Sequence, residues 1–133
     1  MTLSYSTIAK NATANALAAA ISAAGRGYVQ IRSGSRPATA DTAVTGTLLA
    51  TITLTTTAFS DAVGGLITAN GVPLTANVVA SGTASWFRVY KGNGVAVLDG
   101  SVSETGGDGD MQIDNLTFVS GGTVSLQAFS LTQ

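Results

Sequence analysis

The chain of 133 residues has neither cysteine nor histidine. It therefore lacks disulfides, thiolate nucleophiles, Ser-His-Asp and Cys-His catalytic systems, and the usual ligand sets for zinc. It also lacks a Walker motif and the glycine pattern of dinucleotide-binding proteins. No stretch approaches the roughly twenty apolar residues of a membrane span. These absences predict a protein that is not an enzyme, holds no cofactor or metal and has no membrane partner.

Charged residues are scarce, at 10% of the chain with a formal net charge of −1. Six lysines and arginines do not form the basic patch of a nucleic-acid-binding domain, so we expect no nucleic-acid partner. Four basic residues precede the first acidic one, and the last five acidic residues have no base among them. This separation favours docking between copies through complementary charges, with ordinary solvated loops as the alternative. The candidate inter-subunit charges are Arg26, Arg32, Arg36, Asp108, Asp110 and Asp114.

Small and hydroxyl-bearing residues take the places that charges usually occupy. The hydrophobic content of 45% is enough for the core of one domain. Threonine and serine suit exposed strand faces and protein contacts, and a low charge removes the repulsion between copies. The composition therefore predicts a subunit of an assembly.

The beginning of the chain has the pattern of an alanine-rich helix from Ser6 to Ala24. Ser6 or Thr7 can cap its start, and Gly25 stands where a left-handed cap would end it. We expect a helical segment, residues 1–26, that packs on the rest of the chain or on a partner subunit. Its predicted apolar stripe consists of Ile8, Ala12, Leu17, Ile21 and Ala24.

Beyond Gly27 the hydrophobic pattern alternates with the period of β-strands. A hairpin is predicted from Thr83 to Ser103, because Gly92-Asn93-Gly94 forms the kind of tip that tight turns need. The segments predicted as further strands are 28–34, 47–56, 111–119 and 123–133, the last two joined by a tight turn at 120–122. Residues 27–133 are therefore predicted to form one antiparallel domain. The expected fold is mainly β, an antiparallel β-sandwich or barrel-like domain with one N-terminal helix.

Trp86, Arg88 and Tyr90 alternate onto one face of the predicted hairpin. They could form a contact platform for carbohydrate or protein, with Arg88 stacked between the rings. The alternative is that one face of this strand belongs to the core, which the large area of aromatic side chains favours.

The glycine-rich segment from Thr105 to Asp114 is the best candidate for a cation site. Asp108, Asp110 and Asp114 can offer the oxygen ligands that calcium prefers. The spacing does not fit an EF-hand, because Gln112 and Val119 stand where further ligands belong. A plain acidic turn is therefore the favoured interpretation.

Three segments carry a resemblance to a known family. They are "YVQIRSGSRPATADTAVTGTLLATITL" (28–54), "GTASWFRVYKGNGVAVLDGSV" (82–102) and the closing "GGTVSLQAFSLTQ" (121–133). Together with the alanine-rich opening helix, they resemble small virion structural proteins of tailed bacteriophages, over nearly the whole chain.

The resemblance implies a capsid decoration (cement) protein on the outside of the virion. Its partners would be the major capsid protein and copies of itself, commonly as a trimer, and no catalytic residues would come with the family. A tail or baseplate component is the structural alternative. A carbohydrate-binding module that uses Trp86, Arg88 and Tyr90 is the alternative of another class.

Overall fold

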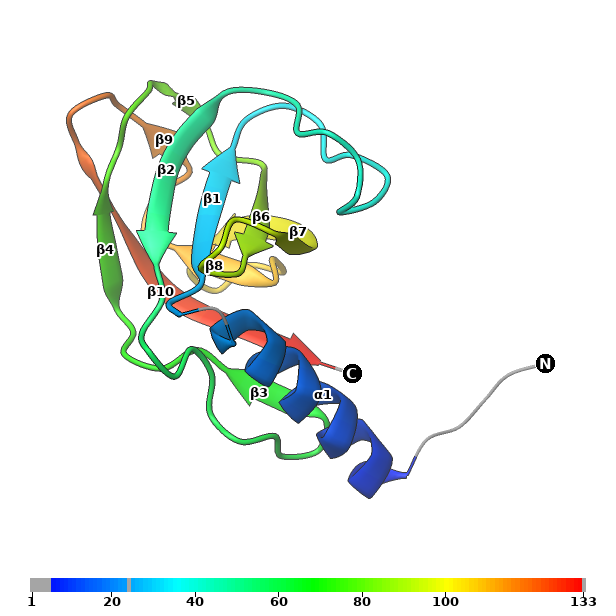
Figure 1. Cartoon of the computed structure of the whole chain (residues 1–133). Coiled ribbons are helices and arrows are strands. Elements are labelled where there is room, and N and C mark those ends of the chain that lie inside the picture. Colours follow the sequence, from blue (N-terminus) through cyan, green and yellow to red (C-terminus); the bar gives the residue numbers. More distant parts are fainter. Residues whose placement is uncertain (1–5, 24, 133) are drawn as a thin grey trace.

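The computed structural model describes residues 6–23 and 25–132. In this part of the chain one helix is followed by ten strands (Figure 1). Their bounds are α1 Thr7–Ser22, β1 Tyr28–Arg32, β2 Leu48–Thr53, β3 Leu66–Thr68, β4 Leu74–Asn77, β5 Gly82–Thr83, β6 Trp86–Tyr90, β7 Ala96–Glu104, β8 Met111–Ile113, β9 Thr117–Phe118 and β10 Thr123–Thr132.

Helix α1 begins where the sequence predicts, with Ser6 as its cap. The Ala9 N–H donates to Ser6 Oγ over 3.3 Å, which satisfies one of the free donors of the first turn. After the helix ends, Gly25 takes a φ of +94°, a conformation that glycine adopts without strain.

The buried face of α1 differs from the predicted stripe. Ala14 and Ile21 are fully buried, but Ile8 is 83% exposed and Ala12 is exposed as well. The prediction was wrong at these two positions because Ile8 and Ala12, one turn apart, lie on the face of α1 that is turned away from Ala14 and Ile21. Ala24 lies outside the described residues.

Eight of the ten strands form one curled mixed sheet, a half-barrel, in the order β2-β1-β6-β7-β8-β10-β3, with β4 also paired to β10. A bridge between Ala50 and Val78 brings β2 to the segment that follows β4. The prediction of a mainly β, barrel-like domain with one helix is confirmed. Buried side chains of the core include Val29, Ile31, Ile52, Phe87, Val89, Met111, Ile113, Leu126 and Phe129.

Two details of the predicted strands were wrong. The segment 111–119 is divided into β8, which pairs with β10, and β9, which pairs with β5 in a separate two-stranded sheet. Strand β8 runs parallel to β7, whereas only antiparallel pairs were expected. The chain returns beside β7 before β8 starts, and Gly109 permits this close approach, since a Cβ there would lie 2.5 Å from the Ser103 nitrogen.

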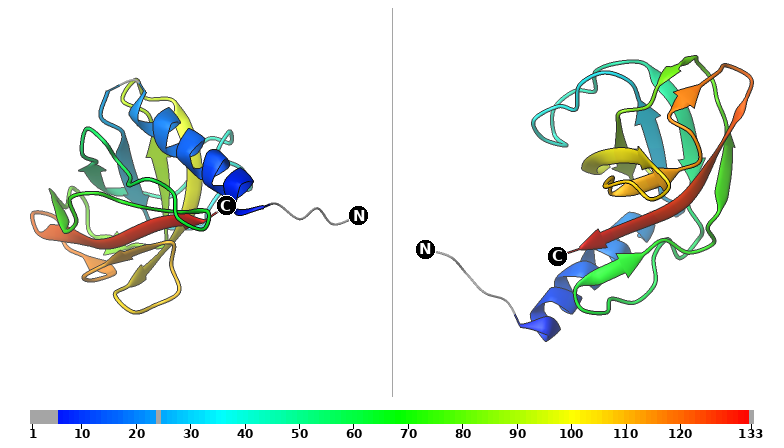
Figure 2. Two further views of the ribbon diagram at one scale, coloured as in Figure 1. Left: turned by 90° about the horizontal axis from the view of Figure 1, so that it is seen from below. Right: turned by 180° about the vertical axis from the view of Figure 1, so that it is seen from behind.

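Helix α1 lies beside β3, at the end of the half-barrel away from β5 and β9 (Figures 1 and 2). The helix shares its core with the sheet, because Ala14 and Ile21 belong to the same cluster as the buried strand residues. Within the described residues, no helix has the length and apolar character needed to cross a membrane.

Candidate functional site: a loop held by a buried arginine

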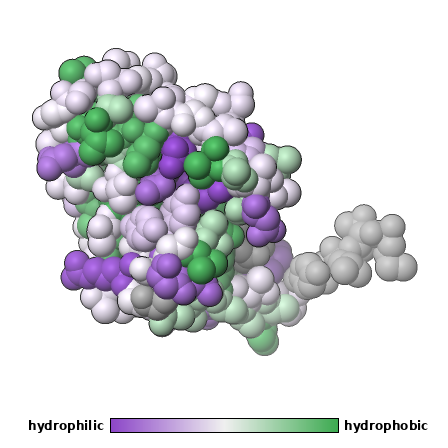
Figure 3. All heavy atoms as spheres, turned by 45° about the horizontal axis from the view of Figure 1, so that its top comes forward, coloured by the Kyte–Doolittle hydropathy of each residue, from purple (hydrophilic) through white to green (hydrophobic). Residues whose placement is uncertain are grey.

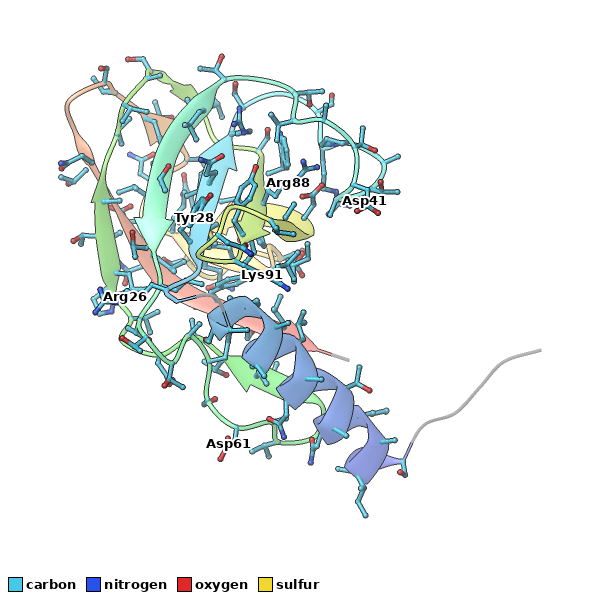
Figure 4. The ribbon with its side chains drawn as sticks, in the orientation of Figure 1. Arg26, Tyr28, Asp41, Asp61, Arg88 and Lys91 are labelled. Carbon is cyan, nitrogen blue, oxygen red and sulfur yellow. The ribbon has the colours of Figure 1, made fainter. Side chains whose placement is uncertain are left out.

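Both faces of strand β6 are buried, although the sequence predicted that only one would be. Phe87 and Val89 point into the half-barrel, and on the other face Trp86 is 1% and Arg88 is 3% exposed. The second face is covered by the loop of residues 33–46, which connects β1 to β2 and is called the clasp loop below (Figure 4). Trp86 and Arg88 therefore do not form an exposed platform.

Arg88 binds both its own sheet and the clasp loop. Its Nε donates to Asp99 Oδ1 over 2.6 Å, and Nη2 donates to Asp99 Oδ2 over 2.9 Å. Its Nη1 donates to the Thr42 carbonyl over 2.7 Å, and Nη2 also reaches the Thr39 carbonyl over 3.2 Å. The guanidinium carbon lies 5.5 Å from the centre of the Trp86 ring, within the range of a cation–π contact.

The pKa of Arg88 is raised above its ordinary value, first by the hydrogen bond with Asp99, while desolvation opposes the rise. A raised pKa in the folded chain adds stability that is fully present below the unfolded pKa and is lost only as the pH rises through the folded value. Because both values are strongly basic, Arg88 stays charged throughout the ordinary pH range.

The beginning of the clasp loop is fixed by further hydrogen bonds. Trp86 Nε1 donates to the Ser33 carbonyl over 3.2 Å, and Ser85 Oγ donates to the Gly34 carbonyl over 2.5 Å. Gly46 has a φ of +76°, and a Cβ at this position would overlap the Ser33 carbonyl oxygen. The loop is therefore held at its beginning by Trp86 and Ser85 and near its centre by Arg88. Its end is tied to its beginning, because the Ser33 N–H donates to the Thr47 carbonyl over 3.1 Å.

A cleft of about 610 Å³ lies between the clasp loop and strand β7. One wall is the segment 36–40 and the other is formed by Val97, Leu98 and Asp99. Arg36 is exposed, whereas the Asp99 side chain is only 7% exposed because Arg88 covers it. The cleft thus has one free cation, Arg36, among its lining residues.

Tyr90, the third residue of the predicted platform, is half-buried and stacks on Tyr28 of β1. The ring centres are 5.0 Å apart and the planes differ by 14°. One face of each ring is therefore used within the protein, and the pair stabilises the neighbouring strands β1 and β6.

The three aspartates of the predicted cation site are all exposed, but they are not brought together. Asp110 Oδ2 accepts from the Ser101 N–H over 3.2 Å, and Asp114 Oδ1 accepts from the Ser125 N–H over 3.0 Å. No group of three or more acidic side chains among the described residues could hold a metal ion. Asp108 and its neighbours form a turn, as the favoured interpretation predicted.

The candidate inter-subunit arginines lie on different parts of the surface. Arg26 is exposed and its Nε donates to Thr56 Oγ1 over 3.4 Å, whereas Arg32 is half-buried beside Gln30. Among the described residues the single ion pair is that of Arg88 with Asp99. The predicted basic and acidic groups therefore do not pair with one another within the described part of the chain.

Comparison with protein-family models, with curated proteins and with solved structures finds no match to this chain.

Proposed function

We propose that this chain is a non-enzymatic structural protein of a tailed-phage virion, a decoration protein that binds the outer capsid surface and bridges major capsid subunits. The resemblance of the three sequence segments suggests the class. The structural observation that carries the proposal is a neutral surface with exposed apolar side chains at two opposite ends of the molecule.

The first apolar end lies beside β5 and β9. Val79 is 61% exposed and Val119 is 64% exposed. Their segments are joined, because the Gly121 N–H donates to the Val78 carbonyl over 3.0 Å. Figure 3 turns this end forward, and much of the visible surface is pale, with small areas of hydrophobic (green) and hydrophilic (purple) residues.

The second apolar end lies where α1 begins. Ile8 is 83% exposed and Val63 is 77% exposed. The two segments are held together by Asn11 Oδ1, which accepts from the Gly65 N–H over 2.7 Å. Exposed apolar groups that recur at both ends suit a protein that contacts two neighbours at once, since several weak contacts add up to firm attachment.

Cryo-electron microscopy of the parent virion, with this chain traced in the map, tests the proposal. Density on the capsid exterior at junctions between subunits is the expected result. Density in the tail would overturn the capsid location in favour of a tail or baseplate component. Absence of the chain from the particle would overturn the virion assignment itself.

Three matched valine and isoleucine variants test which surface attaches. We expect Val119→Asp and Ile8→Asp to weaken retention on particles, because each places a charge in a proposed contact. Val95→Asp is the control, since Val95 is 52% exposed in the turn between β6 and β7, away from both ends. Equal retention of all three variants would show that the apolar ends do not attach the protein.

A further inference from the structure

We propose that the cleft between the clasp loop and β7 binds an extended peptide segment of a partner protein, which adds to β7 as a further strand. The inference is independent of the virion assignment, because it rests on the backbone of β7 and on the walls of the cleft. Its chemistry is β-strand addition, in which main-chain hydrogen bonds supply the affinity.

The part of β7 that lines the cleft has a backbone partner on one side only. Strand β6 pairs with residues 96–101 of β7, whereas β8 pairs with residues 102–104. Val97 is an extra residue at a bulge, since Val89 pairs with Leu98 and Tyr90 pairs with Ala96. The half of β7 that borders the cleft is therefore a strand edge.

Hydrogen-bond alternation shows which groups are free at this edge. The Ser85 N–H donates to the Arg32 carbonyl, so the backbone groups of Arg32 point from β1 toward β6. Along β1, every second residue from Arg32 points the same way, and the residue paired with Arg88 is one of these. Arg88 consequently directs its backbone toward β1, and its partner on β7, Asp99, directs its own N–H and C=O away from β6. Apart from bonds within the strand ladder, no group of the described residues is hydrogen-bonded to the backbone N–H or C=O of Asp99.

Ser101 is the next residue of β7 whose backbone groups point away from β6, and its N–H already has a partner within the protein. The Ser101 N–H donates to Asp110 Oδ2 over 3.2 Å. The chain thus protects the edge beside the loop that precedes β8 and leaves it open where the cleft begins. This contrast indicates a receiving edge, because exposed strand edges are ordinarily blocked.

The opposite wall of the cleft is held by Arg88. Arg88 fixes the carbonyls of Thr39 and Thr42, so the wall of the cleft is held in place by the body of the protein. Arg36 is the one free cation of the lining residues, and it selects a segment that carries a carboxylate.

The test uses the full chain labelled with nitrogen-15 and the blocked peptide acetyl-Thr-Val-Thr-Glu-Thr-Val-Thr-amide. We expect saturable shifts of the Val97 and Asp99 amide signals. The same peptide N-methylated at every amide is the matched control, and it should cause no such shifts because it cannot donate to β7. Absence of saturable shifts at these amides, or equal shifts with the methylated peptide, would overturn the proposal.

A charge exchange tests the role of Arg36. We expect Arg36→Glu to weaken binding of the glutamate peptide by about fivefold, as an exposed ion pair becomes a like-charge pair. A peptide with lysine in place of glutamate should show the opposite preference. Shifts of Val97 and Asp99 that depend on protein concentration without peptide would overturn the proposal in favour of pairing between two copies.

Discussion

The buried pair of Arg88 and Asp99 allows a quantitative test of how the clasp loop is held. We predict that Arg88→Met lowers the free energy of unfolding by about 3 kcal/mol, the lower end of the range for breaking a buried ion pair. The side chains are only 4% and 7% exposed, so water screens them little in the intact protein. The lower end applies because Asp99 lines the open cleft, where water can reach its carboxylate once Arg88 is removed.

The carbonyls of the clasp loop add little to this figure. Thr39 and Thr42 are both exposed, so their carbonyls can bind water after the guanidinium is gone. The double variant Arg88→Met/Asp99→Leu removes both charges and should recover most of the loss, to within about 1 kcal/mol of the natural chain. The clasp loop should remain released in the double variant, because its two carbonyls still lack the donor.

Urea unfolding gives the free energies, with an unchanged m-value as the condition for comparing them. Amide hydrogen exchange of residues 36–46 reports the release of the clasp loop, which we expect in both variants. A cost below about 1 kcal/mol for Arg88→Met would refute the argument, because a stranded buried charge costs more than that. A double variant that is no more stable than the single one would refute it as well.

Three further predictions concern the core, the clasp loop and the helix. The fluorescence of Trp86 should be that of a buried indole and resist quenching by iodide, since its ring is 1% exposed; quenching as strong as that of free tryptophan would contradict the burial. Gly46→Ala should lower the free energy of unfolding by more than about 2 kcal/mol, because the overlap with Ser33 adds to the cost of a left-handed residue. Gly106→Ala is the control and should cost about 1–2 kcal/mol, since the space around its Cβ is open. Equal losses in urea unfolding would exclude the overlap. Ser6→Ala should weaken the start of α1 by about 1 kcal/mol, seen as faster amide exchange in its first turn, and unchanged exchange would show that the cap contributes nothing.

The sequence predicted those features of the fold that depend on neighbouring residues. The cap of α1 at Ser6 and the hairpin of β6 and β7 follow from local patterns, and both are present. The parallel pairing of β8 with β7 could not be predicted in this way, because it depends on how the loop 105–110 returns along β7. The same limit explains Ile8, because the helical pattern does not indicate which face of α1 the rest of the chain covers.

The candidate site shows the same division between local and distant causes. The alternation correctly placed Trp86, Arg88 and Tyr90 on one face of a strand. Their burial depends on the Thr42 carbonyl, 46 residues away from Arg88 in the sequence, and no local pattern indicates that contact. The pairing with Asp99 was within reach, because the register of the predicted hairpin sets these residues opposite one another.

The position of Arg88 links the stability of the domain to the shape of its cleft. Asp99 belongs to one wall and Thr39 to the other, and the guanidinium binds both. Buried ion pairs add little net stability compared with apolar residues of similar volume, but they require one geometry. In a chain with so few charges, the main effect of this pair is therefore to fix the distance between the clasp loop and the open edge of β7. A hydrophobic pair at the same positions would preserve the packing of the core but would not fix the distance between the clasp loop and β7. An apolar side chain has no donor for the loop carbonyls.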